Sequence, residues 1–184
     1  MIIKGWAEIL PILNSVEVLW VAPKVNQYLF DAICRMPKLR GLWVKHSSIK
    51  YVDSSPLQGL EFLRLGSSPS LNSIQQLANI ESLKWLETEN LKRITDFSLL
   101  SDLKQLVGLG IDGSMWTTQL VESLNPIAKL KKLRYPSLTN TRVIYKNLRP
   151  LHRLDNLKTI RMAQWWPKAE VAGLKHANPN LQGI

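Results

Sequence analysis

Few residues of this chain have the types and spacing that catalysis requires. Residues 108–113 read Gly-Leu-Gly-Ile-Asp-Gly, which matches the G-x-G-x-x-G pattern of dinucleotide-binding loops. Such a loop must open a helix, with an acidic residue about twenty positions further on. Here the region near residue 133 is basic, and Leu109 and Ile111 fit the repeat described below. We therefore expect no nucleotide site and no cofactor.

Metal binding and thiol chemistry are equally poorly supported. The three histidines lie far apart in the sequence: His46, His152 and His176. The single cysteine, Cys34, cannot supply a zinc-ligand spacing. We expect its thiol to be buried on an outer segment and inert.

Three carboxylates remain as candidates for acid–base or cation chemistry. Glu87, Glu89 and Asp112 form a cluster at the centre of the concave face that the repeat described below predicts, and they could form an acid–base pair or hold a cation. No histidine and no glycine-rich ligand loop accompanies them. The favoured interpretation is a solvated cluster that contacts a protein, so the chain is expected not to be an enzyme.

Bulk composition is that of a globular domain. The 184 residues are 45% hydrophobic and 21% charged, which suits one domain with a continuous core. No run reaches the roughly eighteen apolar residues of a spanning helix, and Glu8 interrupts any signal peptide. We expect no membrane partner and, from the lone cysteine, a reducing cytoplasmic setting. The formal charge of +10 fits a nucleic acid, an anionic membrane, an acidic protein, or solubility alone.

The strongest pattern in the sequence is an internal repeat. The first apolar position of each unit recurs at 23, 21, 23, 23, 27, 24 and 24 residues. It is occupied by Val16, Leu39, Leu60, Leu83, Leu106, Leu133, Leu157 and Leu181. An alternating L-x-L segment follows, typical of a strand with one buried face, and an x-x-L-x-x-L segment returns the chain at helical spacing. Each unit must stack on its neighbours to bury its apolar face, so the strands form a parallel sheet.

Residues 10–184 resemble the leucine-rich-repeat family. The segments SLNPIAKLKKL (123–133), NLRPLHRLDNL (147–157) and FSLLSDLKQL (97–106) are similar to the bacterial internalin and SDS22-like subclass. The resemblance implies an α/β leucine-rich-repeat solenoid, with a parallel sheet on the concave face and short helices or extended turns on the convex face. The family's asparagine after the strand is replaced by a hydroxyl residue at Ser47, Ser68, Ser114 and Thr141. We expect a less regular ladder of turn hydrogen bonds there.

The repeat defines one domain, residues 1–184. Residues 1–15 are an N-terminal cap or half-repeat, residues 16–180 form seven repeats, and residues 181–184 are a partial strand. The long unit 106–132 has room for a true helix on its outer face.

The C-terminal edge raises a question of oligomeric state. Leu181 and Ile184 fill the first two apolar positions of an eighth strand. An open edge of this kind predicts a homodimer through residues 157–184, or a partner that covers this end. The alternative is that Trp165 and Trp166 fold over the core and act as the cap.

Strand residues that alternate with the buried leucines should face solvent, and they include many aromatic and charged side chains. The candidate partner-binding residues are Trp20, Trp43, Lys45, Phe62, Arg64, Trp85, Glu87, Glu89, Asp112, Tyr135 and Arg161. Gly108, Gly110 and Gly113 should leave a flat or dented patch beside them. Exposed neighbouring aromatics mark interaction sites. The alternative is that Trp20 and Trp43 are covered by residues 1–15 or by each other.

Basic residues follow the first apolar position of many units or lie in the return segment before it, and together they form a rim along one edge. This basic rim comprises Lys38, Arg40, Lys84, Lys131, Lys132, Arg134, Arg149, Arg153 and Lys158. Its plainest interpretation is a solvated edge. The expected function is non-catalytic binding of a protein on the concave face, by analogy as an inhibitor or immunity protein of a toxin. An adaptor, a secreted effector, or a nucleic-acid binder that uses the basic rim are the alternatives.

Overall fold

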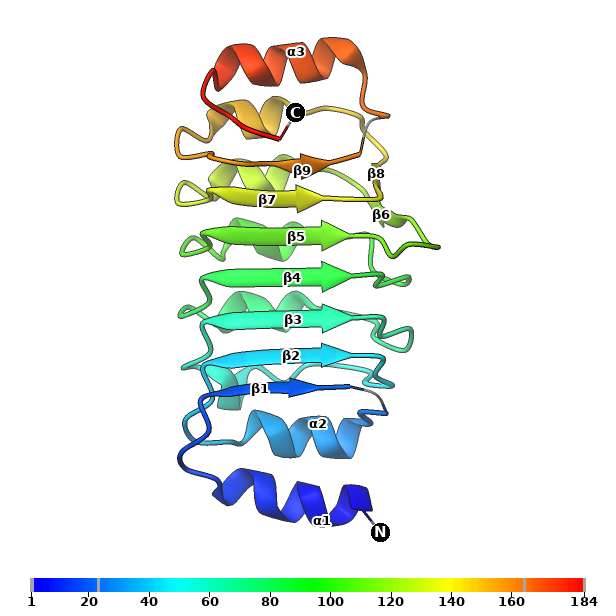
Figure 1. Cartoon of the computed structure of the whole chain (residues 1–184), viewed down its shortest axis with the longest axis vertical. Coiled ribbons are helices and arrows are strands. Elements are labelled where there is room, and N and C mark those ends of the chain that lie inside the picture. Colours follow the sequence, from blue (N-terminus) through cyan, green and yellow to red (C-terminus); the bar gives the residue numbers. More distant parts are fainter. Residues whose placement is uncertain (1, 23, 164, 184) are drawn as a thin grey trace.

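The computed structural model describes residues 2–22, 24–163 and 165–183, and it is a stack of parallel strands (Figure 1). Seven strands form one sheet in the order β1-β2-β3-β4-β5-β7-β9, so each strand pairs with the strand of the next unit. Their bounds are β1 (Val18–Val21), β2 (Gly41–Lys45), β3 (Phe62–Gly66), β4 (Trp85–Glu89), β5 (Gly108–Asp112), β7 (Tyr135–Leu138) and β9 (Arg161–Met162). This is the predicted parallel sheet of the solenoid.

The register of the sheet follows the leucines. Leu42, Leu63, Leu86 and Leu109 are adjacent partners across β2 to β5, and all four are buried. Because side chains alternate between faces, this register sends the intervening residues to the other face. A slip of one residue would bury charges and expose leucines. We call the face away from the leucines the open face.

Short helices return the chain between strands. They are α2 (Gln27–Cys34), η2 (Ser55–Leu57), η3 (Gln75–Asn79), η4 (Ser98–Ser101), η5 (Asn125–Lys129), η6 (Arg149–Arg153) and, after the last strand, α3 (Lys168–Ala177). In Figure 1, α2 lies below β1 and α3 lies above β9, while the short helices between them lie behind the sheet. Only α2 and α3 are α-helices; α2 is N-capped by Asn26, whose side chain accepts a hydrogen bond from the Leu29 backbone. The η helices are single 3-10 turns that each bury one or two side chains.

The outer helix predicted for residues 106–132 is wrong. That unit has only the five-residue 3-10 helix η5, and its extra residues form a loop at 113–118 and the strand β6 (Gln119–Val121). Strand β6 pairs with β8 (Thr141–Val143) in a separate two-stranded sheet. Figure 1 shows this loop projecting beyond the ends of the neighbouring strands.

Both ends of the core are covered. At the N-terminal end lie α1 (Ile2–Ile9) and η1 (Leu10–Ile12), whose Ala7 and Leu10 are buried in the core cluster. At the C-terminal end α3 lies against η6, and Figure 1 shows it across the top of the stack.

The two tryptophans of the proposed C-terminal cap differ in their exposure to solvent. Trp166 is buried, whereas Trp165 is exposed, so α3 and Trp166 form the cap without Trp165. The expected open core at this end is therefore wrong. The partial strand does pair with its neighbour, because Thr159 bridges Gln182, while Ile184 lies outside the described residues. The homodimer through residues 157–184 stays a prediction.

Polar side chains stabilise the turns after the strands, where five of the described non-glycine residues adopt positive φ angles: Lys24, His46, Ser67, Asn90 and Asn140. The hydroxyls of Ser47 and Ser68 are 2.7 Å apart, and Thr141 donates to the Ile111 carbonyl. Three of the hydroxyl residues that replace the family's asparagine, Ser47, Ser68 and Thr141, thus form hydrogen bonds between units, two of them with each other in a buried pair.

Candidate functional site

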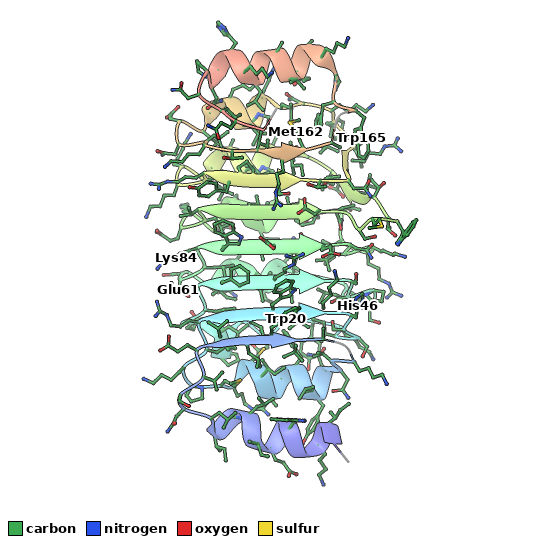
Figure 2. The ribbon with its side chains drawn as sticks, in the orientation of Figure 1. Trp20, His46, Glu61, Lys84, Met162 and Trp165 are labelled. Atoms are coloured by element: carbon green, nitrogen blue, oxygen red, sulfur yellow. The ribbon has the colours of Figure 1, made fainter. Side chains whose placement is uncertain are left out.

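The open face brings the predicted residues side by side in two adjacent columns. Trp20, Trp43, Arg64, Glu87, Gly110, Ser137 and Arg161 occupy matching positions on neighbouring strands. Val18, Gly41, Phe62, Trp85, Gly108 and Tyr135 form the second column. Figure 2 shows Trp20 over the face of the sheet at β1. The alternation of the strands therefore places these side chains as the sequence predicted.

A stacked pair of tryptophans begins the site. The rings of Trp20 and Trp43 are 4.5 Å apart at an angle of 13°. The Arg64 guanidinium lies 4.4 Å from the Trp43 ring centroid, a cation–π contact. Trp43 is half-buried between these neighbours, while Trp20 is 67% exposed. The two tryptophans thus cover each other in part, and Trp20 remains available to a partner.

A second aromatic pair lies further along the face. Trp85 and Tyr135 stack with centroids 5.8 Å apart, across the intervening strand. The Trp85 ring lies over Gly108, where a Cβ atom would come within 2.5 Å of it. The Trp85 indole also donates to Glu87 Oε1 at 2.9 Å. The dent predicted at Gly108 is therefore wrong, since Trp85 fills it.

Ion pairs connect the two aromatic pairs. Arg64 binds Glu87 at 2.8 Å and Glu89 at 3.0 Å, and Lys45 binds Glu89 at 3.0 Å. Burial of Glu89 raises the pKa of its carboxyl, but hydrogen bonds from Arg64 and Lys45 outweigh burial and hold the pKa below its ordinary value. The carboxylates are thus paired, which orients them and restrains Arg64.

Asp112 has a different environment. Its carboxylate accepts from Ser137 Oγ at 2.8 Å and from the Thr139 backbone N–H at 2.7 Å. Burial nevertheless raises the pKa of Asp112 above its ordinary value. It lines a polar hollow of about 190 Å³ together with Arg64 and Arg161. The hollow is thus lined by both carboxylate and guanidinium groups.

Sequence reasoning missed two features beside this face. Gln119 is a buried amide that joins β6 to the unit before it, accepting from the Leu91 N–H at 2.8 Å and donating to the Ile94 carbonyl at 2.7 Å. The loop ahead of it exposes Met115 and Trp116. The signal for both was the 27-residue spacing, which was interpreted as a helix.

Neither metal nor thiol chemistry gains support from the structure. Within the described ranges, no three His, Cys, Asp or Glu side chains are grouped to hold a metal ion. The expected burial of Cys34 on α2 is confirmed, and burial raises the pKa of its thiol well above the ordinary value. Nor does any helix in the part of the chain described here have the length and apolarity to cross a membrane.

Two residues of the basic rim, Arg40 and Lys84, are paired with carboxylates. Glu61 binds Arg40 at 2.6 Å and Lys84 at 2.9 Å, and Glu17 lies 3.7 Å from Arg40. Figure 2 shows Glu61 and Lys84 together at one edge of the sheet. The excess charge lies further along: residues 1–122 carry twelve Lys or Arg and twelve Asp or Glu, whereas residues 123–184 carry twelve and two.

No protein-family model and no curated protein matches this chain. Solved structures do. An internalin from Listeria monocytogenes matches 98% of this chain and 53% of its own, with 22% identity and a TM-score of 0.68. Internalin C2 from the same organism matches 99% of this chain and 81% of its own, with 19% identity and a TM-score of 0.62.

A plant receptor is also similar to this chain. The leucine-rich-repeat ectodomain of the Arabidopsis thaliana receptor kinase GASSHO1/SCHENGEN3, solved in complex with Casparian strip integrity factor 2, matches 97% of this chain and 24% of its own. The identity is 13% and the TM-score 0.52. The chain thus spans about half of the internalin and a quarter of the receptor ectodomain. At these identities the comparisons show the fold, an α/β leucine-rich-repeat solenoid.

Proposed function

We propose that this chain is a non-catalytic module that binds a protein partner on the open face of its sheet. The observation that carries the proposal is the continuous array of aromatic and charged side chains from Trp20 to Tyr135. Four of its aromatic side chains are stacked in pairs: Trp43 contacts Trp20 and Arg64, and Trp85 contacts Tyr135. Trp, Tyr and Arg are the residue types that contribute most to protein interfaces, and an array already ordered loses little entropy on binding.

The chemistry of this face favours a protein over a nucleic acid. Three carboxylates, Glu87, Glu89 and Asp112, lie near its centre, where they would repel a phosphate backbone. Their pairing with Arg64 and Lys45 gives the face both signs of charge at short range. Mixed charge of this kind suits the polar and aromatic surface of a protein.

A binder without a catalytic constellation acts by covering its partner or by bridging two partners. We propose the first, an inhibitor or immunity protein that occludes a toxin in the cytoplasm, within the internalin and SDS22-like subclass. An adaptor or an effector would use the same face. The plant ectodomain similar to this chain was solved with a bound factor, which supports binding as a use of this fold.

Affinity capture with matched variants tests the proposal. The wild-type chain, Trp43→Ala and Trp6→Ala are immobilised and exposed to extract of the native host, and the affinity of each retained protein is then measured. Trp6 is an exposed tryptophan on α1, away from the open face, and serves as the control. Trp43→Ala should cost about 2 kcal/mol, or roughly thirtyfold in affinity, while Trp6→Ala should change it little. A lower melting temperature with unchanged affinity would contradict the proposal.

Nucleic-acid binding through the basic rim is the second candidate, favoured by the excess charge in residues 123–184. Reversing Lys131, Lys132 and Arg134 to Glu should abolish salt-sensitive retention of DNA or RNA if that activity exists. The same triple variant should keep the protein partner of the open face. Loss of that partner would place the interface on the rim instead.

A further inference from the structure

Exposed apolar side chains gather along one edge of the solenoid, away from the open face. We call this set the edge ridge: Met115, Trp116, Leu120, Ile144, Tyr145 and Trp165. Trp116 is 89% exposed and Met115 is 84% exposed, the two highest values among the exposed large hydrophobic residues. Figure 1 places β6, β8 and the projecting loop at this edge, and Figure 2 shows Trp165 on the same side. A monomer rarely keeps so many apolar groups in water unless they have a partner.

The tip of the edge ridge is held by a hydrogen-bonded turn. Ser114 Oγ accepts from the backbone N–H groups of Trp116, at 3.3 Å, and Thr117, at 3.0 Å. Asn140 Nδ2 donates to the Ser114 carbonyl at 2.6 Å. Gly113 allows the chain to enter this turn, because a Cβ there would come within 2.5 Å of the Thr117 carbonyl oxygen. The exposure of Met115 and Trp116 is therefore fixed by the backbone.

The remaining members of the edge ridge adjoin one another through β6 and β8. Leu120 is paired with Arg142 across the two strands, and the Ile144 N–H donates to the Val121 carbonyl at 2.9 Å. Trp165 lines a small depression together with Arg142 and Lys146. Arg142 is thus a neighbour of both Leu120 and Trp165 at this edge.

Basic side chains lie beside the edge ridge at both of its ends, and the exposed carboxylate of Glu122, which follows β6, accepts a hydrogen bond from Thr95. Beside the loop, Lys92 lines the same hollow as Trp116. Glu89 also lines it but is bound by Lys45 and Arg64. At the other end, Arg142 and Lys146 line the depression that holds Trp165. A surface with apolar side chains between cations is complementary to a surface that has an apolar interior and anionic groups at its boundary.

We propose that the edge ridge docks this protein on the surface of an anionic lipid bilayer. Trp and Tyr prefer the depth of the lipid headgroups, while Met, Leu and Ile reach the acyl chains. Lysine and arginine attract anionic headgroups and keep their charges in water. This mode needs no spanning helix, so it extends beyond the sequence-based expectation of no membrane partner, which rested on the lack of a spanning segment.

Two features favour lipid over the other occupants of such a surface. The tip projects beyond the strands, and a fluid bilayer accepts a projecting loop without a matching hollow. Nucleic acid would use aromatic rings as stacking platforms, whereas Met115, Leu120 and Ile144 offer it nothing. This proposal concerns a different surface from the open face and does not depend on the protein partner proposed there.

Co-sedimentation with vesicles tests the proposal. The wild-type chain should bind vesicles that contain phosphatidylglycerol and release from them at high salt, and should bind pure phosphatidylcholine weakly. The double variant Met115→Ser/Trp116→Ser should bind the anionic vesicles at least about tenfold more weakly. Trp6→Ser, a change to an exposed tryptophan elsewhere, should bind like the wild type. Circular dichroism checks that each variant is folded.

The other outcomes overturn the proposal. If the folded wild-type chain does not bind anionic vesicles, the proposal is wrong. Binding that Arg142→Glu/Lys146→Glu abolishes but Met115→Ser/Trp116→Ser leaves intact means adsorption by charge alone. Retention of single-stranded DNA or of a protein that requires Trp116, without vesicle binding, assigns the edge ridge to that ligand instead. If the double variant is unfolded, Tyr145→Ser, two residues after β8, is tested in its place and should also weaken binding to the anionic vesicles.

Discussion

Adding one methyl group at Gly108 should disturb the open face without removing any of its aromatic side chains. A Cβ at residue 108 would lie 2.5 Å from Trp85 Cε3 and closer still to Cδ2 and Cε2. Carbon atoms in contact are normally about 3.5–4.0 Å apart, so the ring must move by more than about 1 Å. It would then lose its stack on Tyr135 and its hydrogen bond to Glu87.

The magnitude follows from these contacts. The aromatic stack contributes about 0.5–1.5 kcal/mol, and the hydrogen bond to a carboxylate about 1.5–3 kcal/mol when buried. Both are reduced because Trp85 and Glu87 are half-buried. Replacing glycine by alanine in a strand by itself stabilises the folded state by about 0.5–1 kcal/mol. The net loss for Gly108→Ala should therefore be about 1–2 kcal/mol, a fall in melting temperature of roughly 2–8 °C.

Gly110→Ala is the matched control, because it lies on the same strand and face. A Cβ there would meet Asp112 and Glu87 at 3.3 Å, a tight contact that those flexible side chains can relieve. Thermal unfolding by circular dichroism and the indole N–H resonance of Trp85 report the outcome. If Gly108→Ala matches Gly110→Ala in both, Trp85 does not lie on Gly108 and the face is not ordered as described. Partner affinity should also fall for Gly108→Ala alone.

Three further predictions concern stability, pH and reactivity. Gln119→Ala leaves the Leu91 N–H and the Ile94 carbonyl unpaired, so urea denaturation should show a loss of about 2–4 kcal/mol; an unchanged midpoint would contradict the role of this amide. The raised pKa of Asp112 means that its ionisation costs stability above the folded pKa, whereas the lowered pKa of Glu89 means stability that is lost as pH falls through that pKa. Between pH 6 and pH 3, the melting temperature should therefore fall less for Glu89→Gln than for the wild type, and more for Asp112→Asn than for the wild type. Cys34 should react with a thiol reagent only at the rate of unfolding, because burial raises its pKa and blocks access.

The sheet and its register could be predicted because the information is local and repeated. Leu42 and Leu63 identify the buried face of each strand, and alternation then assigns Trp43 and Arg64 to the open face. The details of the face depend on contacts between units. Trp85 lies over Gly108, and Arg64 bridges two glutamates. These contacts depend on side-chain rotamers and on the spacing between strands, which the sequence of a single unit does not specify.

Strand β6 could not be predicted for the same reason. A 27-residue unit has room for a helix, and its length was the only local signal. Gln119, however, finds its partners at Leu91 and Ile94, in the preceding unit, and β6 pairs with β8 in the following unit. Tertiary contacts of this kind override local propensity. The exposed edge ridge depends on β6, so it could not be predicted from the sequence either.

The separation of charge along the stack gives the molecule a large electric dipole. Residues 1–122 are formally neutral and residues 123–184 carry the net charge of +10, so the centre of charge lies toward the end that contains β7, β9 and α3. In the field near any anionic surface, the molecule experiences a torque as well as an attraction. It should rotate before contact and arrive with its C-terminal units leading. Its rate of productive encounter should then decrease with ionic strength even where the final contact is apolar.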